Sequence, residues 1–428
     1  MIFRFRGGIH PKTNKLTHDS HTVAFPLPEK LFIPLSQHIG KPAFPCVNAG
    51  DIVKKGSLIG IADGDFSANV YSSACGTVEN IVTMPLSNGN ACKHVVIKVN
   101  GNDEYTKLEP LVNPDAHRII ERVKEAGIVG MGGATFPTHI KLAPKNPVDT
   151  LIINGAECEP YITCDYRVII EHIEDFIGGI LIEAETLNVK RILIGIERIN
   201  AEAVKVLRAA TADIPEISVA ALPVKYPQGS EKQLIYALTK RVVPQGKLPS
   251  DVGVAVSNVQ TAYAIKRAVS YGEPLIERVV TISGDIDDDK RGNYIIPTGV
   301  TVKDIADYVS ANNYKKIISG GPMMGFALSN MSVAVTKGSS AILFFNENKL
   351  LSKPSPCINC SRCARACPLR LMPMYIDAYA SAGELDKALK YGAMDCFECG
   401  SCAYVCPAKR PLVQAIRLAK KTIKEKKQ

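Results

Sequence analysis

The spacing of eight cysteines near the end of the chain constrains this protein more than any other feature of its sequence. Two runs have the form C-x2-C-x2-C-x3-C-P, with 28 residues between the last cysteine of the first run and the first cysteine of the second. Their members are Cys357, Cys360, Cys363, Cys367 and Pro368, then Cys396, Cys399, Cys402, Cys406 and Pro407. Three cysteines at intervals of three residues on a tight loop can direct their sulfur atoms to three corners of one iron–sulfur cubane. We therefore expect two [4Fe–4S] clusters.

The fourth cysteine of each run, which a proline follows, is expected to ligate the other run's cluster, as in two-cluster ferredoxins. This crossed assignment gives the first cluster, called cluster one, the ligands Cys357, Cys360, Cys363 and Cys406. It gives cluster two the ligands Cys396, Cys399, Cys402 and Cys367. Zinc and disulfides are the alternatives. A zinc ribbon uses only four cysteines in two pairs, and disulfide frameworks belong mainly to small secreted domains.

The composition is typical of a soluble globular protein with several domains. The 428 residues are 46% hydrophobic and 22% charged. No apolar stretch is long enough to cross a bilayer, and the first residues, MIFRFRGGIHPK, lack the apolar core of a signal peptide. The net charge of +9 is expected to be spread along the chain except in the tail KKTIKEKKQ. Such a tail favours a solvated helix end over docking to an acidic partner or lipid.

Residues 1–110 are expected to form an all-β domain behind an irregular start of about thirty residues. Short β-runs such as FIPL, SLIGIA, GTVENIV and HVVIKV follow. The phrases GDIVKKGSLIGIADG and YSSACGTVENI resemble the barrel-sandwich fold of lipoyl and biotinyl domains. A carrier domain needs a lysine at its hairpin tip, and residues 63–69 contain none, so a carrier function is not expected. Cys46, Cys75 and Cys92 are interpreted as small core residues.

Residues 111–272 alternate between helical and strand patterns, which predicts a Rossmann-like α/β domain with a largely parallel sheet. Helices are expected before Gly127 and over Asp165–Leu187. Buried strands are expected over Val148–Asn154, Arg191–Gly195, Ile217–Leu222 and the segment GVAVSN. Acidic and polar residues follow two strand ends, in the segments NGAECEP and YPQGSE. Because open α/β sheets bind ligands at the carboxyl ends of their strands, we expect a ligand site there.

A glycine cluster in this domain is interpreted as a phosphate cradle. Gly130, Gly132 and Gly133 can bring backbone amides close to an anion, and Lys141 adds a positive charge nearby. The segment GIVGMGGATFPTHIKL matches neither the dinucleotide-binding G-x-G-x-x-G pattern nor a Walker loop. A turn without a ligand is the alternative.

Four ordered motifs make the chain resemble the flavin-binding, NADH-oxidising subunit of respiratory complex I. They are GxGGAxFPTxxK, NGAExEP, YxxGxE and NVxT. With the opening GGIHPK, the segment SGGPMMGFAL, the barrel-sandwich domain and two cysteine runs, the chain is more similar still to the RnfC family. This family is the peripheral subunit of Rnf ferredoxin:NAD+ oxidoreductase complexes. The resemblance covers nearly the whole chain and implies FMN as cofactor and NAD(H) as substrate.

The resemblance also implies which residues bind these molecules. The FMN phosphate and ribityl chain would be held by Gly130, Gly132, Gly133 and Lys141. The rest of the flavin would be lined by Asn154, Glu157, Tyr226, Gly229, Asn258 and Thr261. Phe136 would stack on NADH, with core packing as the alternative, and NADH hydroxyls or amide would be read by Glu159 and Glu231. Three residues differ from the complex I motifs: Ala156, Tyr161 and Ser230. These differences affect the expected nucleotide affinity.

Two further domains are expected after the flavin domain. Residues 273–346 resemble the soluble ligand-binding β-grasp (SLBB) module that follows the flavin domain in complex I, and packing between domains is its expected role. Residues 347–428 would hold the clusters. Amphipathic helices are predicted over Leu371–Ala382 and Glu384–Tyr391, between the cysteine runs, which indicates an α-helical ferredoxin domain.

The resemblance implies an electron-transfer subunit of an ion-translocating complex, which exchanges hydride between NAD(H) and FMN and single electrons with the two clusters. Its expected place is the cytoplasmic face of the membrane, beside the other Rnf subunits. These include an iron–sulfur subunit that meets ferredoxin, and no nucleic acid is expected. Two alternatives stay open: a flavin-dependent cobalamin reductase of a microcompartment, which shares the wording GAECEP, and a non-catalytic scaffold for clusters.

Overall fold

A parallel four-stranded sheet forms the centre of the α/β domain in the computed structural model, which describes residues 5–311, 314–347 and 353–426. The strand order is β11-β10-β9-β12, and every neighbouring pair is parallel. The strands are β9 (Thr150–Gly155), β10 (Arg191–Glu197), β11 (Ile217–Leu222) and β12 (Val254–Asn258). The buried, apolar strands are typical of a sheet covered on both faces. The predicted parallel sheet is confirmed.

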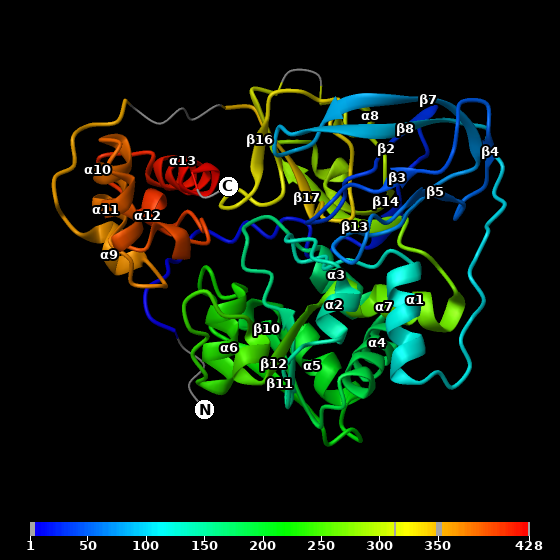
Figure 1. Ribbon diagram of the computed structural model, residues 1–428, viewed down its shortest axis with the longest axis horizontal. Coiled ribbons are helices and arrows are strands. Elements are labelled where there is room, and N and C mark those ends of the chain that lie inside the picture. The colour runs from blue at the N-terminus through cyan, green and yellow to red at the C-terminus, as the bar shows by residue number, and fades with distance from the viewer. Residues whose placement is uncertain (1–4, 312–313, 348–352, 427–428) are drawn as a thin grey trace.

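Helices cover both faces of this sheet because successive strand residues point to opposite sides. Leu151 and Ile153 join the core beneath α4 and α7, whereas Ile152 joins the core beneath α6. The helices of the domain are α1 (Ala116–Glu125), α2 (Thr138–Leu142), α3 (Cys164–Glu171), α4 (Ile173–Thr186), α5 (Ala201–Ala210), α6 (Glu231–Thr239) and α7 (Val259–Tyr271). Figure 1 shows them around the sheet, below the other domains.

The single helix expected over 165–187 is wrong, because the chain forms two helices that break at His172. His172 has φ −131° and ψ 41°, which lie outside the helical region. The acidic residues Glu174 and Asp175 then fall in the first turn of α4, where the helix dipole favours negative charge. The prediction rested on hydrophobic periodicity and did not use this acidic pair, which indicates the start of a second helix.

A six-stranded sheet of order β1-β14-β13-β17-β15-β16 forms the domain expected to be a β-grasp fold. Its strands are β1 (Thr22–Ala24), β13 (Glu277–Gly284), β14 (Gly292–Pro297), β15 (Lys316–Ser319), β16 (Phe326–Leu328) and β17 (Ala341–Phe345), with helix α8 (Val302–Tyr308). Strand β1 pairs in parallel with β14. The first thirty residues are therefore not wholly irregular, since part of them completes an edge of this sheet.

The barrel-sandwich domain consists of two small sheets, which share one core with the β-grasp sheet. The first contains β2 (Lys30–Pro34), β8 (Ala91–Val99), β7 (Gly76–Pro85) and β4 (Ile52–Val53); the second contains β3 (Phe44–Pro45), β5 (Leu58–Ile61) and β6 (Val70–Tyr71). Cys75 and Cys92 are buried as expected, but Cys46 is exposed. The core interpretation is wrong for Cys46, which follows a short edge strand.

The cysteine runs lie in a separate helical domain, at the left of Figure 1. Its helices are α9 (Arg362–Ala366), α10 (Pro373–Ser381), α11 (Leu385–Lys390), α12 (Ser401–Tyr404) and α13 (Leu412–Glu425). Two of them, α10 and α11, confirm the helices predicted between the runs. Among the residues that the structure describes, no helix has both the length and the apolar character needed to cross a membrane.

The segment 5–24, called the N-terminal strap, connects three of these domains. Gly8 donates its amide to the carbonyl of Ala366 in the cluster domain, at 2.8 Å. Ile9 pairs in both directions with Tyr226 of the α/β domain, at 2.8 and 2.9 Å. Gly7 has φ +71°, and a Cβ there would collide with the carbonyl of Cys367. The GGI sequence thus allows a backbone approach that a larger residue would prevent.

A buried carboxylate between helix α4 and strand β12 makes the stability of the α/β domain depend on pH. Glu183 is 3% exposed and accepts a hydrogen bond from Ser257 Oγ at 2.9 Å. Burial raises its pKa from 4.5 to about 8, against smaller opposing effects of Ser257 and Lys141. Because the folded state disfavours ionisation, the stabilisation from the neutral group is complete below pH 4.5 and is lost as the pH rises toward 8.

Glu183→Gln is therefore expected to raise the midpoint of thermal unfolding by a few degrees at pH 8 and to change it little at pH 5. Thermal unfolding followed by circular dichroism at both pH values measures this. Glu185→Gln, on the exposed face of the same helix, is the matched control and should have little effect at either pH. An equal effect of Glu183→Gln at pH 5 and pH 8 would contradict the assignment.

Candidate functional site

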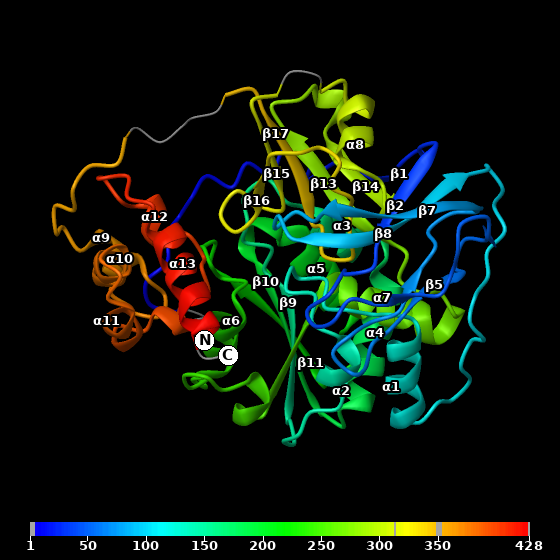
Figure 2. The ribbon, with the colours of Figure 1, turned by 45° about the horizontal axis from the view of Figure 1, so that its top comes forward.

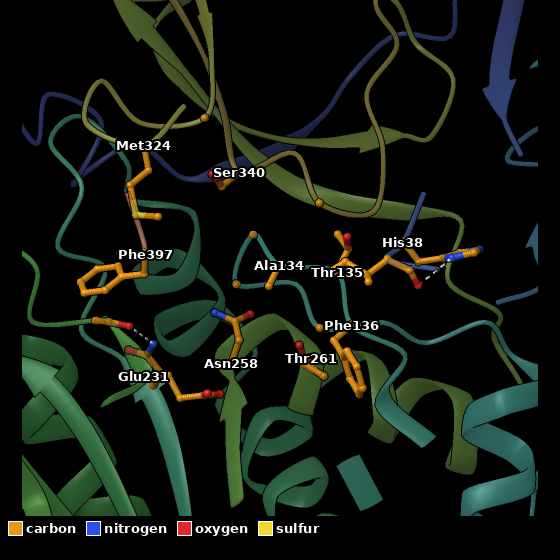
Figure 3. A pocket seen from close by; sticks show the side chains of 18 of the residues that line it. His38, Ala134, Thr135, Phe136, Glu231, Asn258, Thr261, Met324, Ser340 and Phe397 are labelled. Carbon is orange, nitrogen blue, oxygen red and sulfur yellow. Dashed lines mark hydrogen bonds between the residues drawn. The ribbon is translucent and has the colours of Figure 1, made fainter. Parts of the chain in front are cut away.

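A cavity of about 1100 Å³ lies at the carboxyl ends of the parallel strands, where such sheets bind ligands. All four domains contribute to its wall. The α/β domain supplies the loop 130–136, the ends of β9 and β12, and the loop 226–232. The other domains supply segments 36–40, 319–326 and 338–340, together with Phe397 and Glu398. Figure 3 shows the side chains converging from these elements.

Twelve of the thirteen residues expected to bind flavin or nucleotide lie in this one wall. They are Gly130, Gly132, Gly133, Phe136, Lys141, Asn154, Glu159, Tyr226, Gly229, Glu231, Asn258 and Thr261. Sequence reasoning missed the wall residues from the other domains, including His38, Met324, Ser340 and Phe397 (Figure 3). The segment SGGPMMGFAL could have indicated Met324, because the segment is part of the resemblance to the family but was given no role.

The glycine loop is anchored at both ends and leaves its tip open. Gly130 donates its amide to Phe136 O at 2.8 Å, and Met131 donates its amide to Thr261 Oγ1, also at 2.8 Å. In the described part of the chain, the amides of Gly132, Gly133 and Ala134 find no acceptor. Gly133 has φ +105°, and a Cβ there would meet no atom within 4 Å. An anchored loop with three free amides beside an open space fits a bound phosphate.

Two charged side chains of the wall face each other beside this loop. Lys141 Nζ lies 3.7 Å from Glu231 Oε2 and 3.4 Å from the carbonyl oxygen of Val256. Both side chains keep more than a third of their surface exposed, so the pair is weak and can be exchanged for contacts to a ligand. Lys141 thus offers a positive charge, and Glu231 offers an acceptor for hydroxyl or amide groups.

Phe136 is half-buried in the cavity wall. Its ring makes an edge-on contact with Phe66 of the barrel-sandwich hairpin, with centroids 6.0 Å apart and planes at 76°. In Figure 3 it lies on the side of the cavity near His38, which also comes from the barrel-sandwich domain. The hairpin tip that lacks a carrier lysine therefore helps to shape the cavity.

Glu157 differs from the expectation, because its side chain does not belong to the cavity wall. Its carboxylate is 4% exposed, accepts the amide of Asp165 at 2.8 Å and lies 3.9 Å from Lys15 of the strap. Burial raises its pKa to about 8, and Lys15 opposes the shift. The backbone at Glu157 is left-handed, with φ +41°. Glu157 therefore stabilises the loop after β9 from outside the cavity, while the side chain of Glu159 lines the cavity.

Glu159 belongs to a hydrogen-bonded group, called the Glu159 junction, that joins three domains. Its carboxylate accepts the amides of Met323 and Met324 of the β-grasp loop, at 3.0 and 2.9 Å. It also lies 3.4 Å from the hydroxyl of Tyr226, which donates to the carbonyl of Cys399 at 2.8 Å. Burial raises the pKa of Glu159 to about 7, although the two amides favour the anion.

The glycine pair of SGGPMMGFAL explains how the β-grasp loop comes so close to Glu159. A Cβ at Gly321 would overlap the Glu159 carboxylate. A Cβ at Gly400, after Cys399, would lie 3.0 Å from the carbonyl of Met323. Small residues thus allow the β-grasp loop, the strand end and the cluster-two loop to meet at one point.

The cysteines gather in the two groups that crossed ligation requires. Cys357, Cys360, Cys363 and Cys406 line one small cavity, together with Met374. Burial raises the pKa of Cys402, and the neighbouring thiols of Cys396, Cys399 and Cys367 raise it further. Phe397 and Glu398, between two cysteines of the second group, line the large cavity, whereas no residue from 357 to 363 does.

Family models match most of the chain in three segments. A barrel-sandwich hybrid domain of RnfC matches residues 3–102, the FMN-binding domain of Nuo51 matches residues 123–267, and a 4Fe-4S dicluster domain matches residues 356–409. These descriptions confirm the expected FMN and two [4Fe–4S] clusters.

Curated relatives match the chain over nearly its whole length. A subunit of the proton-translocating ferredoxin:NAD(+) oxidoreductase complex of Clostridium ljungdahlii is 44% identical over 98% of this chain and 94% of its own length. The chain belongs to the RnfC family. A subunit of the Na(+)-translocating complex of Acetobacterium woodii is 40% identical over 98% of this chain and 97% of its own. A subunit of the ion-translocating oxidoreductase complex of Rhodobacter capsulatus is 39% identical, over 99% and 84%.

Among solved structures, an NAD+-reducing [NiFe]-hydrogenase in the H2-reduced state resembles the RnfC-family chain in fold. The TM-score is 0.52 at 19% identity, over 72% of this chain and 63% of the hydrogenase chain. At this identity the likeness concerns the fold alone.

Gly133→Val is expected to abolish FMN binding while both clusters still assemble. A branched residue is strained at φ +105° and would fill the space beside the free amides. The flavin-to-protein ratio after gel filtration, measured with iron and sulfide content, tests this. Gly246→Val is the matched control, because Gly246 also has positive φ and open surroundings but lies outside the cavity wall. Stoichiometric FMN in Gly133→Val would exclude the phosphate-cradle assignment.

Proposed function

We propose that this chain is the subunit of an ion-translocating ferredoxin:NAD+ oxidoreductase that exchanges hydride with NAD(H) and single electrons with two [4Fe–4S] clusters. The main observation behind the proposal is a single cavity whose wall comes from both the α/β domain and the cluster domain. Free amides of the glycine loop line it in the α/β domain, and Phe397 and Glu398 of the cluster-two loop line it opposite. Such a cavity holds a flavin within reach of a one-electron carrier.

FMN, when bound, supplies the conversion between the electron pair of a hydride and the single electrons of a cluster. The protein residues then bind and orient. The amides of Gly132, Gly133 and Ala134, with the charge of Lys141, would hold the phosphate. Asn154 donates to the carbonyl of Gly229 at 2.7 Å and fixes the loop 226–232 against β9. The β-grasp and barrel-sandwich segments cover the cavity and reduce its contact with water.

Cluster two, when bound, would supply the one-electron carrier nearer the cavity, because Phe397 and Glu398 of its loop line the wall. The Glu159 junction supports this arrangement, since it ties the cavity wall to the backbone of Cys399. Met374 and Leu412 pack with Cys363, Cys402 and Cys406 between the two cysteine groups, so cluster one would be the next carrier. For Glu159 the proposed role is therefore to position the cluster-two loop, in addition to its expected contact with NADH.

The proposed setting is the cytoplasmic face of a membrane complex. The names of these relatives describe one member of a multi-subunit ferredoxin:NAD(+) oxidoreductase complex. We infer that the chain attaches through other subunits, including an iron–sulfur subunit that meets ferredoxin. The two relatives are named for different coupling ions, which agrees with ion transport that belongs to other subunits.

Anaerobic titration of the purified, cluster-containing protein with NADH tests the function directly. We expect stoichiometric FMN whose visible absorbance is bleached by NADH, followed by cluster reduction. The variant Gly133→Val should keep its clusters but lose the response to NADH. A flavin that stays oxidised in excess NADH, or a protein that carries clusters but no flavin, would support a scaffold and contradict the proposal.

A further inference from the structure

The positive charge of the chain is concentrated in the cluster domain. Residues 353–426 contain thirteen Lys and Arg against six Asp and Glu, while the whole chain has a net charge of +9. Within this domain, the segments 353–376 and 399–424 contain ten basic residues and no acidic residue. These two segments hold seven of the eight cluster cysteines. Even without the tail from residue 420, residues 353–419 contain nine Lys and Arg against five Asp and Glu, so the charge outside the tail is not spread along the chain as expected.

The two cysteine groups differ in their contact with solvent. Cys399 and Cys402 of cluster two are buried, and the strap, Tyr226 and Met323 cover their side of the domain. Cys357 of cluster one is exposed, and the neighbouring Ile358 is 64% exposed. In Figures 1 and 2, the segment that leads into α9 runs along the outer edge of the molecule, away from the parallel sheet. The cysteine group expected to bind cluster one therefore reaches the outer edge of the molecule at Cys357.

Three basic residues lie close in sequence to this exposed edge. Arg362, Arg365 and Lys409 are exposed and lie next in sequence, or nearly so, to the cysteines of cluster one. Arg365 donates to the carbonyl of Cys360 at 3.3 Å. Arg362 and Lys409 form no ion pair with any residue in the described ranges. Their charges are therefore available to an incoming molecule.

Asp377, the acidic residue of α10, does not neutralise the positive charge at this edge. Asp377 is buried and paired with Arg410 at 2.6 Å. Glu398 is paired with Arg417 and Lys420, at 2.7 and 2.6 Å, on the side of the large cavity. Of the other acidic residues, Asp395 lines the large cavity, Glu384 and Asp386 are exposed at the start of α11, and Glu425 is exposed near the end of α13. None of the six acidic residues lies in the segments 353–376 and 399–424, which hold the cysteines of cluster one.

We propose that the edge formed by Cys357, Ile358, Arg362, Arg365 and Lys409, called the cluster-one surface, docks an acidic protein that carries its own exposed iron–sulfur cluster. The inference rests on the proposed function, because it concerns the outer end of the same electron route. One electron passes between the two clusters, so that one is oxidised as the other is reduced, and no bond or proton changes place.

The chemistry of the surface favours a protein over a lipid membrane. An exposed apolar residue with exposed basic residues nearby in the chain is typical of protein interfaces with electrostatic steering. A membrane on this surface would cover cluster one with lipid, which has no electron to exchange. Attraction between opposite charges raises association rates by 10- to 1000-fold and weakens as salt screens it.

The test measures electron exchange between the complete, FMN- and cluster-loaded chain and a small acidic ferredoxin with two [4Fe–4S] clusters, reduced with dithionite. Stopped-flow spectroscopy at low and high ionic strength gives the second-order rate constant. The surface variant is Arg362→Glu with Lys409→Glu. The matched control is Lys421→Glu with Lys424→Glu on α13, which changes the net charge equally. Iron content, FMN content and NADH oxidation with ferricyanide are measured for each protein.

We expect the surface variant to be about tenfold slower at low salt and similar to the unmodified chain at high salt. The control should be nearly unchanged, and all proteins should keep their cofactors and ferricyanide activity. Equal slowing by the control, no salt dependence, or no effect of the surface variant would overturn the docking proposal. So would binding to phosphatidylglycerol vesicles that depends on Arg362 and Lys409 while ferredoxin exchange does not. A chain that binds no clusters would overturn the proposed function itself.

Discussion

The carboxylate of Glu159 fixes the positions of the cavity wall, the β-grasp loop and the cluster-two loop relative to one another. It follows a buried parallel strand, accepts two amides from the β-grasp loop and lies beside Tyr226, whose hydroxyl donates to the backbone of Cys399. A buried carboxylate is costly unless its lone pairs are filled, so this position strongly favours the observed arrangement of three domains. The proposed electron route would depend on this arrangement, because it places the cluster-two loop at the wall of the cavity.

Other buried charges join the domains in the same way. Lys15 of the strap donates to the carbonyl oxygens of Glu157 and Glu159, at 2.7 and 3.1 Å. Lys337 donates to the carbonyls of Asn69 and Gly127, at 2.7 and 2.8 Å, and so ties the β-grasp domain to two others. Burial lowers the pKa of Lys337 to about 7. Since backbone carbonyls satisfy both lysines, the interfaces resemble a domain interior more than a flexible contact.

The sequence predicted local features well wherever a motif has a direct chemical reason. The cysteine spacing, the glycine loop and the strand ends indicate the clusters, the cradle and the ligand-binding edge of the sheet. Glu157 and Glu159 illustrate the limit. Both follow β9, but the left-handed backbone at Glu157 and the strap lysine below it decide which carboxylate reaches the cavity. Both features depend on contacts between segments more than 140 residues apart in the sequence. A local sequence pattern cannot reveal such contacts. The domain limits expected at residues 110, 272 and 346 stay predictions.

The central claim is that cluster two, with the crossed ligand Cys367, lies between the flavin and cluster one. Anomalous diffraction at the iron edge, from crystals of the FMN-loaded chain, tests it most directly. We expect the iron site nearer the flavin to be bound by Cys396, Cys399, Cys402 and Cys367. The claim would be contradicted if the nearer site were bound by Cys357, Cys360 and Cys363, or if each cysteine run closed its own cluster.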